Sequence, residues 1–166
     1  IMKQKILAFF VITLFISGCG NSAFMMLDKS PAYQKALHYT QQKELRNYLH
    51  TLAIMRVTYL SPLNEKLYGE NPTFFVGINI KNDFARKKKG IYNPLFDFTA
   101  NNTKMIDIEE VIAEHPLYKE MPVINRWSRY YKITFIGDPQ TAIMNLKYMH
   151  KQSNESVVFT FDALST

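Results

Sequence analysis

Residues 74–81 read Phe74-Phe75-Val76-Gly77-Ile78-Asn79-Ile80-Lys81. From Phe74 onward, every second position carries a large apolar side chain, and the alternate positions end in Asn79 and Lys81. Successive side chains of a strand point to opposite faces, so this pattern predicts a β-strand with one face in a core and the other face mostly in water.

The same alternation recurs on both sides of this segment. It predicts strands over 52–59, 131–135, 142–148 and 157–161, and shorter strands at 96–98 and 105–108. Pro, Gly and Asn lie in the gaps between them and favour turns. About seven short strands of this kind predict a mainly β fold, an immunoglobulin-like antiparallel β-sandwich. A half-open barrel, or an α+β fold with one antiparallel sheet, fits the same pattern.

A helix is expected at the N-terminal edge of this domain. Ser30 and Pro31 suit a helix start. Residues at spacings of three or four then share one half-apolar face, namely Tyr33, Leu37, Thr40, Glu44 and Tyr48. The pattern predicts a helix over about 31–48. Between 109 and 126 we expect a long connection that contains one or two helical turns stopped by Pro116.

The first residues follow a different pattern. Lys3 and Lys5 form a positively charged segment before an apolar run, residues 6–16, which leads into Ile16-Ser17-Gly18-Cys19. Residues 2–19 resemble the signal of bacterial lipoproteins, whose lipobox reads Leu, a small residue, Gly or Ala, then Cys; Ile16 stands here in place of Leu. An apolar helix of about 11 residues rises only about 16 Å, well short of a bilayer core of roughly 30 Å.

The resemblance implies that residues 1–18 are removed as a signal peptide and that Cys19, the only cysteine, is diacylated. Residues 19–29 would then form a lipidated tether, and residues 30–166 a single globular β-rich domain. Gly20 follows the cysteine where Asp would favour retention, so the resemblance favours the outer membrane over the inner one. With the thiol acylated, no disulfide forms, and stability depends on packing of 12 Phe, 10 Tyr and one Trp.

The sequence shows no motif for catalysis or metal binding. The four histidines, at 38, 50, 115 and 150, are scattered, and the acidic residues at 107, 109, 110 and 114 lack the pattern of a calcium loop. We interpret the acidic group as a solvated helix start. Nucleophile elbows and phosphate loops are absent from the sequence. We therefore expect no catalytic residues, no metal and no cofactor.

One segment has the composition of a binding surface. Arg126, Trp127, Arg129 and Tyr130 are residue types enriched at interaction hot spots. If Tyr131 points inward, strand alternation sends Tyr130 outward. The alternative, which the sequence favours, is that Trp127 plugs one end of the sandwich while the arginines cap carbonyls or pair with acidic residues.

Together these patterns predict a lipid-anchored cell-envelope protein that faces the periplasm. Its acyl chains would hold the membrane, and its domain would be a non-enzymatic binding or accessory module for another envelope protein or a glycan. The formal net charge of +6 is mild, and a nucleic-acid partner is not expected in this compartment. A small envelope hydrolase and a purely structural envelope lipoprotein are the alternatives.

Overall fold

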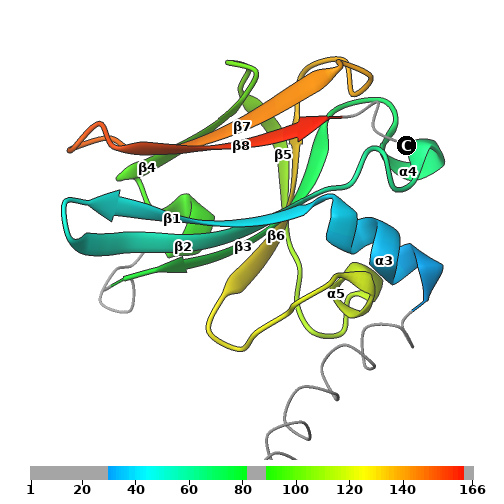
Figure 1. Cartoon of the computed structure of the whole chain (residues 1–166), viewed down its shortest axis with the longest axis horizontal. Helices are drawn as coiled ribbons and strands as arrows, with labels where there is room; N and C mark the ends of the chain where they lie inside the picture. The colour runs from blue at the N-terminus through cyan, green and yellow to red at the C-terminus, as the bar shows by residue number, and fades with distance from the viewer. Residues whose placement is uncertain (1–29, 82–88, 163–166) are drawn as a thin grey trace, which may run out of the picture. The chain divides into compact units, whose positions relative to one another are not determined.

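The computed structural model describes residues 30–81 and 89–162. Residue contacts divide the chain into units of residues 1–31 and 32–166, and the elements discussed below pack within the second unit. This unit is mainly β, with two antiparallel sheets (Figure 1). Cys19 and the predicted tether lie outside the described residues.

The two sheets contain five and three strands. The larger sheet has the order β1-β2-β3-β6-β5, with bounds Thr40–Asn47, His50–Tyr59, Thr73–Ile80, Arg129–Phe135 and Met105–Glu110. The smaller sheet has the order β4-β7-β8, with bounds Phe96–Ala100, Ile143–His150 and Ser156–Asp162. With β1 set aside, the orders β2-β3-β6-β5 and β4-β7-β8 match the constant-type immunoglobulin sandwich, so β1 is an added edge strand.

The core lies between the sheets and contains the inward residues that alternation predicts. Tyr59, Phe74, Tyr131, Phe135 and Phe159 are each 0% exposed. Two further core residues, Leu146 and Tyr148, come from β7 and are also fully buried. One expected inward residue, Ala142, is exposed because β7 begins after it, at Ile143.

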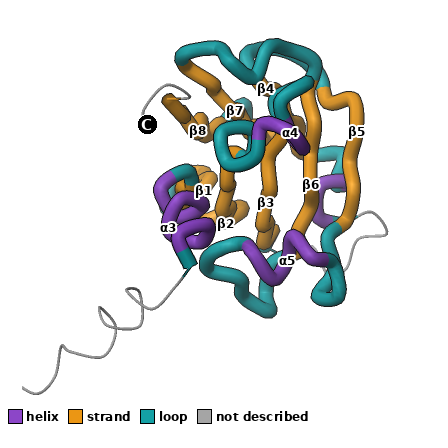
Figure 2. Tube along the Cα trace, turned by 90° about the vertical axis from the view of Figure 1, so that its right-hand side faces the viewer, coloured by secondary structure: helices purple, strands orange, loops and turns teal. Residues whose placement is uncertain are grey.

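The outer face of the larger sheet is also covered. Two short helices, α3 (Pro31–His38) and α5 (Pro116–Glu120), lie over it on the side away from the smaller sheet (Figures 1 and 2). They contribute Ala36 and Leu117 to a second apolar cluster with Phe75 and Tyr130. The expectation that this face of β3 is mostly wet was therefore wrong: Phe75 is 3% exposed.

The predicted helix over 31–48 is only partly helical. The helix ends at His38, and Thr40–Asn47 instead form β1, paired with β2 from Thr40↔Thr58 to Asn47↔His50. Only Leu45 of β1 is buried, so this edge strand lacks the apolar alternation that marks a strand in sequence. The helical spacing of its side chains was a coincidence.

Pro116 begins a helix instead of stopping one. The backbone of His115 is extended, and its ring nitrogen Nδ1 accepts a hydrogen bond from the Leu117 amide at 3.1 Å, so His115 caps α5. Proline suits the first turn because its missing N–H would have no partner there. The acidic residues at 107, 109 and 110 lie on β5, so the interpretation of a helix start was wrong for them, whereas Glu114 directly precedes the N-cap of α5.

The remaining elements are short. Helix α4 (Glu65–Tyr68) lies between β2 and β3, and a 3-10 turn, η2 (Gly90–Tyr92), precedes β4. Edge strands β1 and β8 meet on one flank of the sandwich, where Gln41 and Lys43 donate side-chain hydrogen bonds to the backbone carbonyls of Thr160 and Val158. The two sheets are thus joined by polar contacts on this flank as well as by the core.

Candidate functional site

The loop of residues 121–128, between α5 and β6, contains the predicted binding segment. Within this loop, Asn125 is the central residue: its Oδ1 accepts hydrogen bonds from the amides of Trp127 at 2.9 Å and Ser128 at 3.0 Å. The Asn125 amide donates to the hydroxyl of Tyr130 at 2.7 Å. These contacts fix the tip of the loop to the start of β6.

A second attachment comes from β2. The guanidinium group of Arg56 donates to the carbonyl of Val123 and to Oε1 of Gln42. At Val123 the backbone φ is +59°, a conformation that β-branched residues rarely adopt. The surrounding contacts therefore hold the loop in a strained shape, and strain of this kind concentrates where structure serves a function.

The fixed loop exposes large apolar groups. Trp127 is 66% exposed, and the Arg126 guanidinium lies 4.5 Å from the centroid of its ring. Val123 is 45% exposed. Ile112, 59% exposed, follows Val111, whose amide donates to the Tyr130 carbonyl and so places Ile112 beside the start of β6. We refer to Ile112, Val123, Arg126 and Trp127 as the Trp127 surface.

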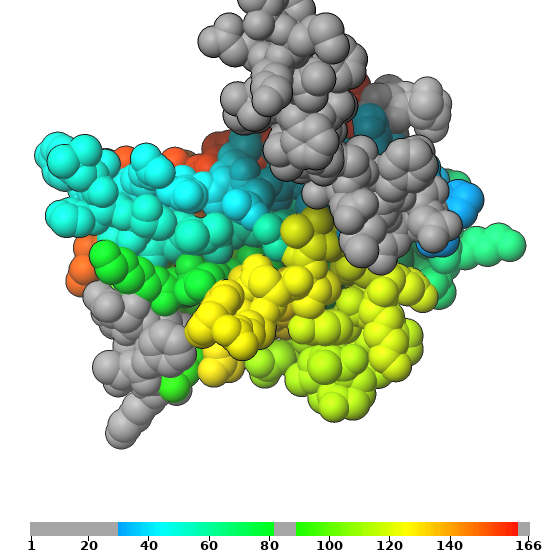
Figure 3. Space-filling view, turned by 60° about the horizontal axis from the view of Figure 1, so that its bottom comes forward, coloured from blue at the N-terminus to red at the C-terminus, as the bar shows by residue number. Residues whose placement is uncertain are grey.

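Figure 3 views the molecule from the side on which this loop lies, with residues 121–128 in yellow at the surface beside α5. The favoured interpretation of Trp127 as a plug in the sandwich was wrong, because a ring 66% exposed fills no core. The loop crosses the outer face of the larger sheet instead of closing the end of the sandwich, and nothing in the local sequence indicates this.

The other two candidate residues, Tyr130 and Arg129, are not part of the Trp127 surface. Tyr130 does point to the face opposite Tyr131, but it is only 4% exposed, with its ring stacked on Phe75 at 5.3 Å and edge-on to Tyr118 at 5.4 Å. Its role is to position Asn125. Arg129 is half exposed and lies 3.5 Å from a carboxylate oxygen of Glu110.

Glu109 joins three elements through charged contacts. One carboxylate oxygen binds the ammonium group of Lys132 on β6, and the other lies 3.2 Å from Nε2 of His115. Because Nδ1 of His115 accepts from the Leu117 amide, Nε2 carries the proton and donates to Glu109. The hydrogen bond from Lys132 is the main cause that lowers the pKa of Glu109 below its ordinary value. Sequence analysis missed this network because it treated His115 as an isolated residue.

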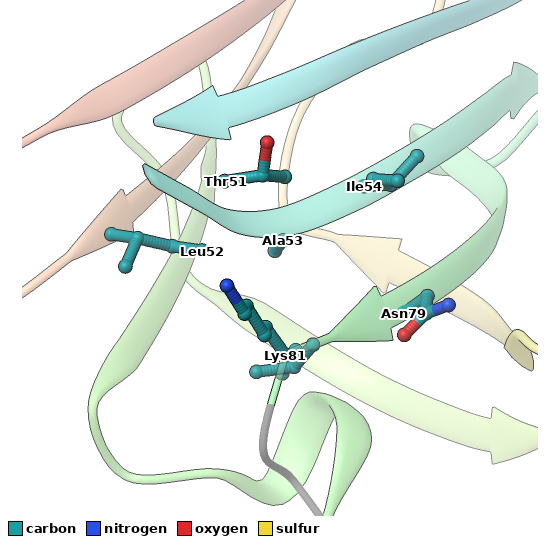
Figure 4. A pocket seen from close by; sticks show the side chains of 7 residues that line it. Thr51, Leu52, Ala53, Ile54, Asn79 and Lys81 are labelled. Atoms are coloured by element: carbon teal, nitrogen blue, oxygen red, sulfur yellow. The ribbon is translucent and has the colours of Figure 1, made fainter. Parts of the chain in front are cut away.

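Two pockets lie elsewhere in the described structure. A cavity of about 400 Å³ lies between β2 and the end of β3, lined by Thr51, Leu52, Ala53, Ile54, Asn79, Ile80 and Lys81 (Figure 4). A smaller cavity of about 150 Å³ lies among α3, α4 and α5 and is lined mainly by apolar side chains, with Lys35 and Glu120. Among the described residues that line the first cavity, Lys81 is the one with an ionisable side chain.

A second exposed apolar feature lies at the β1–β2 turn. Tyr48 and Leu49 are 92% and 96% exposed, and Tyr48 has a φ of +50°. Tight hairpin turns normally place Gly, Asn or Asp at such positions. We refer to Tyr48 and Leu49 as the hairpin tip. Sequence analysis missed it because these residues fell at the end of the predicted helix.

Within residues 30–81 and 89–162, no three His, Cys, Asp or Glu side chains are grouped as a metal site would require. In the same residues, no helix has the length and apolar character needed to cross a membrane. Comparison with protein-family models, with curated proteins and with solved structures finds no match to this chain.

Proposed function

We propose that this chain is a lipid-anchored protein of the bacterial cell envelope, whose β-sandwich is a non-enzymatic binding or accessory module facing the periplasm. The observation that carries the proposal is the lipobox-type run Ile16-Ser17-Gly18-Cys19, placed at the end of an apolar segment and a short distance before a folded domain. Two or more acyl chains on Cys19 would hold the domain durably, whereas a single chain binds reversibly.

The binding role is supported by the exposed apolar side chains that the fold presents on fixed backbone. Trp127 is held out by contacts from Asn125 and stacked with Arg126. Aromatic and arginine side chains combine large contact area with hydrogen-bonding groups, which is why they dominate interaction energies. By contrast, the charged contacts of Glu109 tie structural elements together.

The anchor is tested by labelling cells that produce the protein with radioactive palmitate. We expect label in the wild-type protein, a shift to a smaller mature form, and fractionation with the outer membrane. Cys19→Ser should lose the label and accumulate as the unprocessed precursor. Unchanged processing and membrane fractionation of Cys19→Ser would contradict the anchor. Trp127→Ala is the matched control, since it leaves residues 2–19 intact.

The binding role is tested by crosslinking in intact envelopes from a photoreactive residue at position 49 or 127. A reproducible envelope protein or glycan captured from either position supports a binding module. Capture of nothing but copies of this chain, for a protein present in great abundance, would favour the purely structural lipoprotein.

A further inference from the structure

We propose that the Trp127 surface rests on the same bilayer that holds Cys19, with the indole of Trp127 at the level of the lipid headgroups. This inference rests on the proposed lipid anchor and adds to it an orientation of the domain. The occupant of the surface is the membrane interface itself.

The described domain begins with α3, which lies on the same face of the larger sheet as the loop of residues 121–128. Only residues 20–30 separate Cys19 from α3, and about 11 residues reach no further than about 40 Å even when fully extended. Helix α3 lies over the outer face of the larger sheet, where Ala36 belongs to the same apolar cluster as Phe75 and Tyr130. The loop of residues 121–128 lies on this same face, where Asn125 contacts Tyr130 (Figures 1 and 2). Helix α3, at the start of the described domain, and the loop that carries Trp127 therefore lie on one face of the larger sheet.

The residue types of the Trp127 surface suit a membrane–water interface. Tryptophan favours the membrane–water interface because its ring is apolar and its N–H seeks a polar partner. Arg126, stacked on the ring, presents a guanidinium that suits lipid phosphates. The aliphatic side chains of Ile112 and Val123 are also exposed and add apolar area to the Trp127 surface.

Docking of the Trp127 surface on a bilayer would cost little conformational entropy. The loop is already fixed by Arg56, Asn125 and Tyr130, so docking orders little additional chain. A short tether also keeps the surface at a high effective concentration near the bilayer, and weak interfacial attraction is then sufficient.

This orientation has a consequence for the rest of the domain. The smaller sheet, β4-β7-β8, packs on the opposite side of the larger sheet from α3, α5 and the loop (Figure 1). With the Trp127 surface on lipid, the smaller sheet faces away from the membrane and is the side presented to other envelope components.

The experiment uses the mature acylated protein, purified from cell envelopes and reconstituted into vesicles of phosphatidylethanolamine and phosphatidylglycerol. Because Trp127 is the only tryptophan, its emission reports on one position. We expect a blue-shifted emission that loses most of its intensity when part of the lipid is replaced by brominated phosphatidylcholine. Bromine near the headgroups should quench more than bromine near the chain ends.

The matched control moves the reporter to the hairpin tip. In the double variant Trp127→Phe, Leu49→Trp, the only tryptophan lies at a position 96% exposed in the wild type. We expect red-shifted emission with little loss on brominated lipid. Equal quenching at positions 49 and 127, or stronger quenching at 49, would overturn the proposed orientation.

The outcomes separate docking from anchoring. If the protein carries palmitate and floats with the vesicles while Trp127 stays unquenched, the docking is wrong and the anchor stands. If the protein carries no palmitate, the anchor is wrong, and the orientation that rests on it is overturned with it. Crosslinking from position 127 to an envelope protein, together with unquenched emission in vesicles, would show a protein occupant and overturn the proposal.

Discussion

At Gly77, strand β3 has no side chain on its outer face, and the ring of Tyr130 occupies the space. A Cβ atom at this position would lie 2.5 Å from Cε1 of Tyr130, far closer than atoms pack. The ring cannot retreat easily because it is stacked on Phe75 and contacted edge-on by Tyr118. The hydroxyl that holds Asn125, and with it the Trp127 surface, thus depends on a glycine in the neighbouring strand.

We expect Gly77→Ala to lower the free energy of unfolding by about 1–3 kcal/mol, the usual cost of overpacking a filled site. Urea denaturation measures the loss, and reduced fluorescence anisotropy of Trp127 would report the loosened loop. In a Tyr130→Ala background the cost of Gly77→Ala should shrink, because the clashing ring is gone. An equal cost in both backgrounds would contradict this explanation.

For single residues, the sequence predicted which way a side chain points better than whether anything covers it. Strand alternation correctly placed Tyr130 and Tyr131 on opposite faces, because that period is a local property of the backbone. The burial of Tyr130 depends on a cluster that includes Ala36 of α3, which is distant in sequence, and Leu117 of α5. The exposure of Trp127 likewise follows from contacts of Val123 with Arg56, 67 positions away.

Among the elements, β5, β6 and α5 are joined by the contacts of Glu109 with Lys132 and His115. In the folded protein the pKa of Glu109 lies below 4.5, its ordinary value. A lowered carboxyl pKa stabilises the fold above the unfolded value, and the contribution is lost as pH falls through the folded value. The side chain is 41% exposed, so solvent screens these contacts and limits their contribution to no more than about 1 kcal/mol.

We therefore expect Glu109→Gln to destabilise the protein slightly at neutral pH, with the difference from wild type disappearing as pH is lowered from 4.5 through the folded pKa. Denaturation in urea over a series of pH values measures this. Glu155→Gln, in the exposed turn between β7 and β8, is the matched control. A constant difference across the whole pH range would contradict the assignment.

The sequence predicted central strands better than edge strands. The strands β2, β3 and β6 carry apolar residues at every second position, since one face of each lies in the core. In β1 only Leu45 is buried, and the conformation of this strand depends on its pairing with β2. The helix predicted from the local sequence of residues 40–47 therefore does not form. Helix α5 was misjudged at Pro116 because proline serves helix starts as well as helix ends.

At the scale of the whole molecule, aromatic rings join the two sheets. Phe161 of β8 lies 5.7 Å from Tyr59 of β2 and 5.9 Å from Phe74 of β3, measured between ring centroids. The packing of these rings makes one core out of two sheets, so we expect the sheets to unfold together. The two-sheet fold could be predicted from the count of short alternating strands, but the strand order could not, because it depends on which distant strands pair.

We expect Phe161→Leu to lower the free energy of unfolding by about 1–2 kcal/mol, through lost ring contacts and incomplete filling of the site. Far-UV circular dichroism and Trp127 emission, followed in the same urea titration, should give one midpoint that shifts equally for both signals. Phe161 is distant in sequence from Trp127, so separate midpoints would show that the sheets unfold independently.

Proteins held on a membrane diffuse in two dimensions and collide far more often than they would in free solution. Open strand edges would then invite neighbouring copies to zip together into fibrils. In this chain the flank where β1 meets β8 already has the carbonyls of Val158 and Thr160 occupied by Lys43 and Gln41. With the proposed acyl anchor, these two carbonyls would be less available to an arriving copy, and lateral pairing at this flank would be disfavoured.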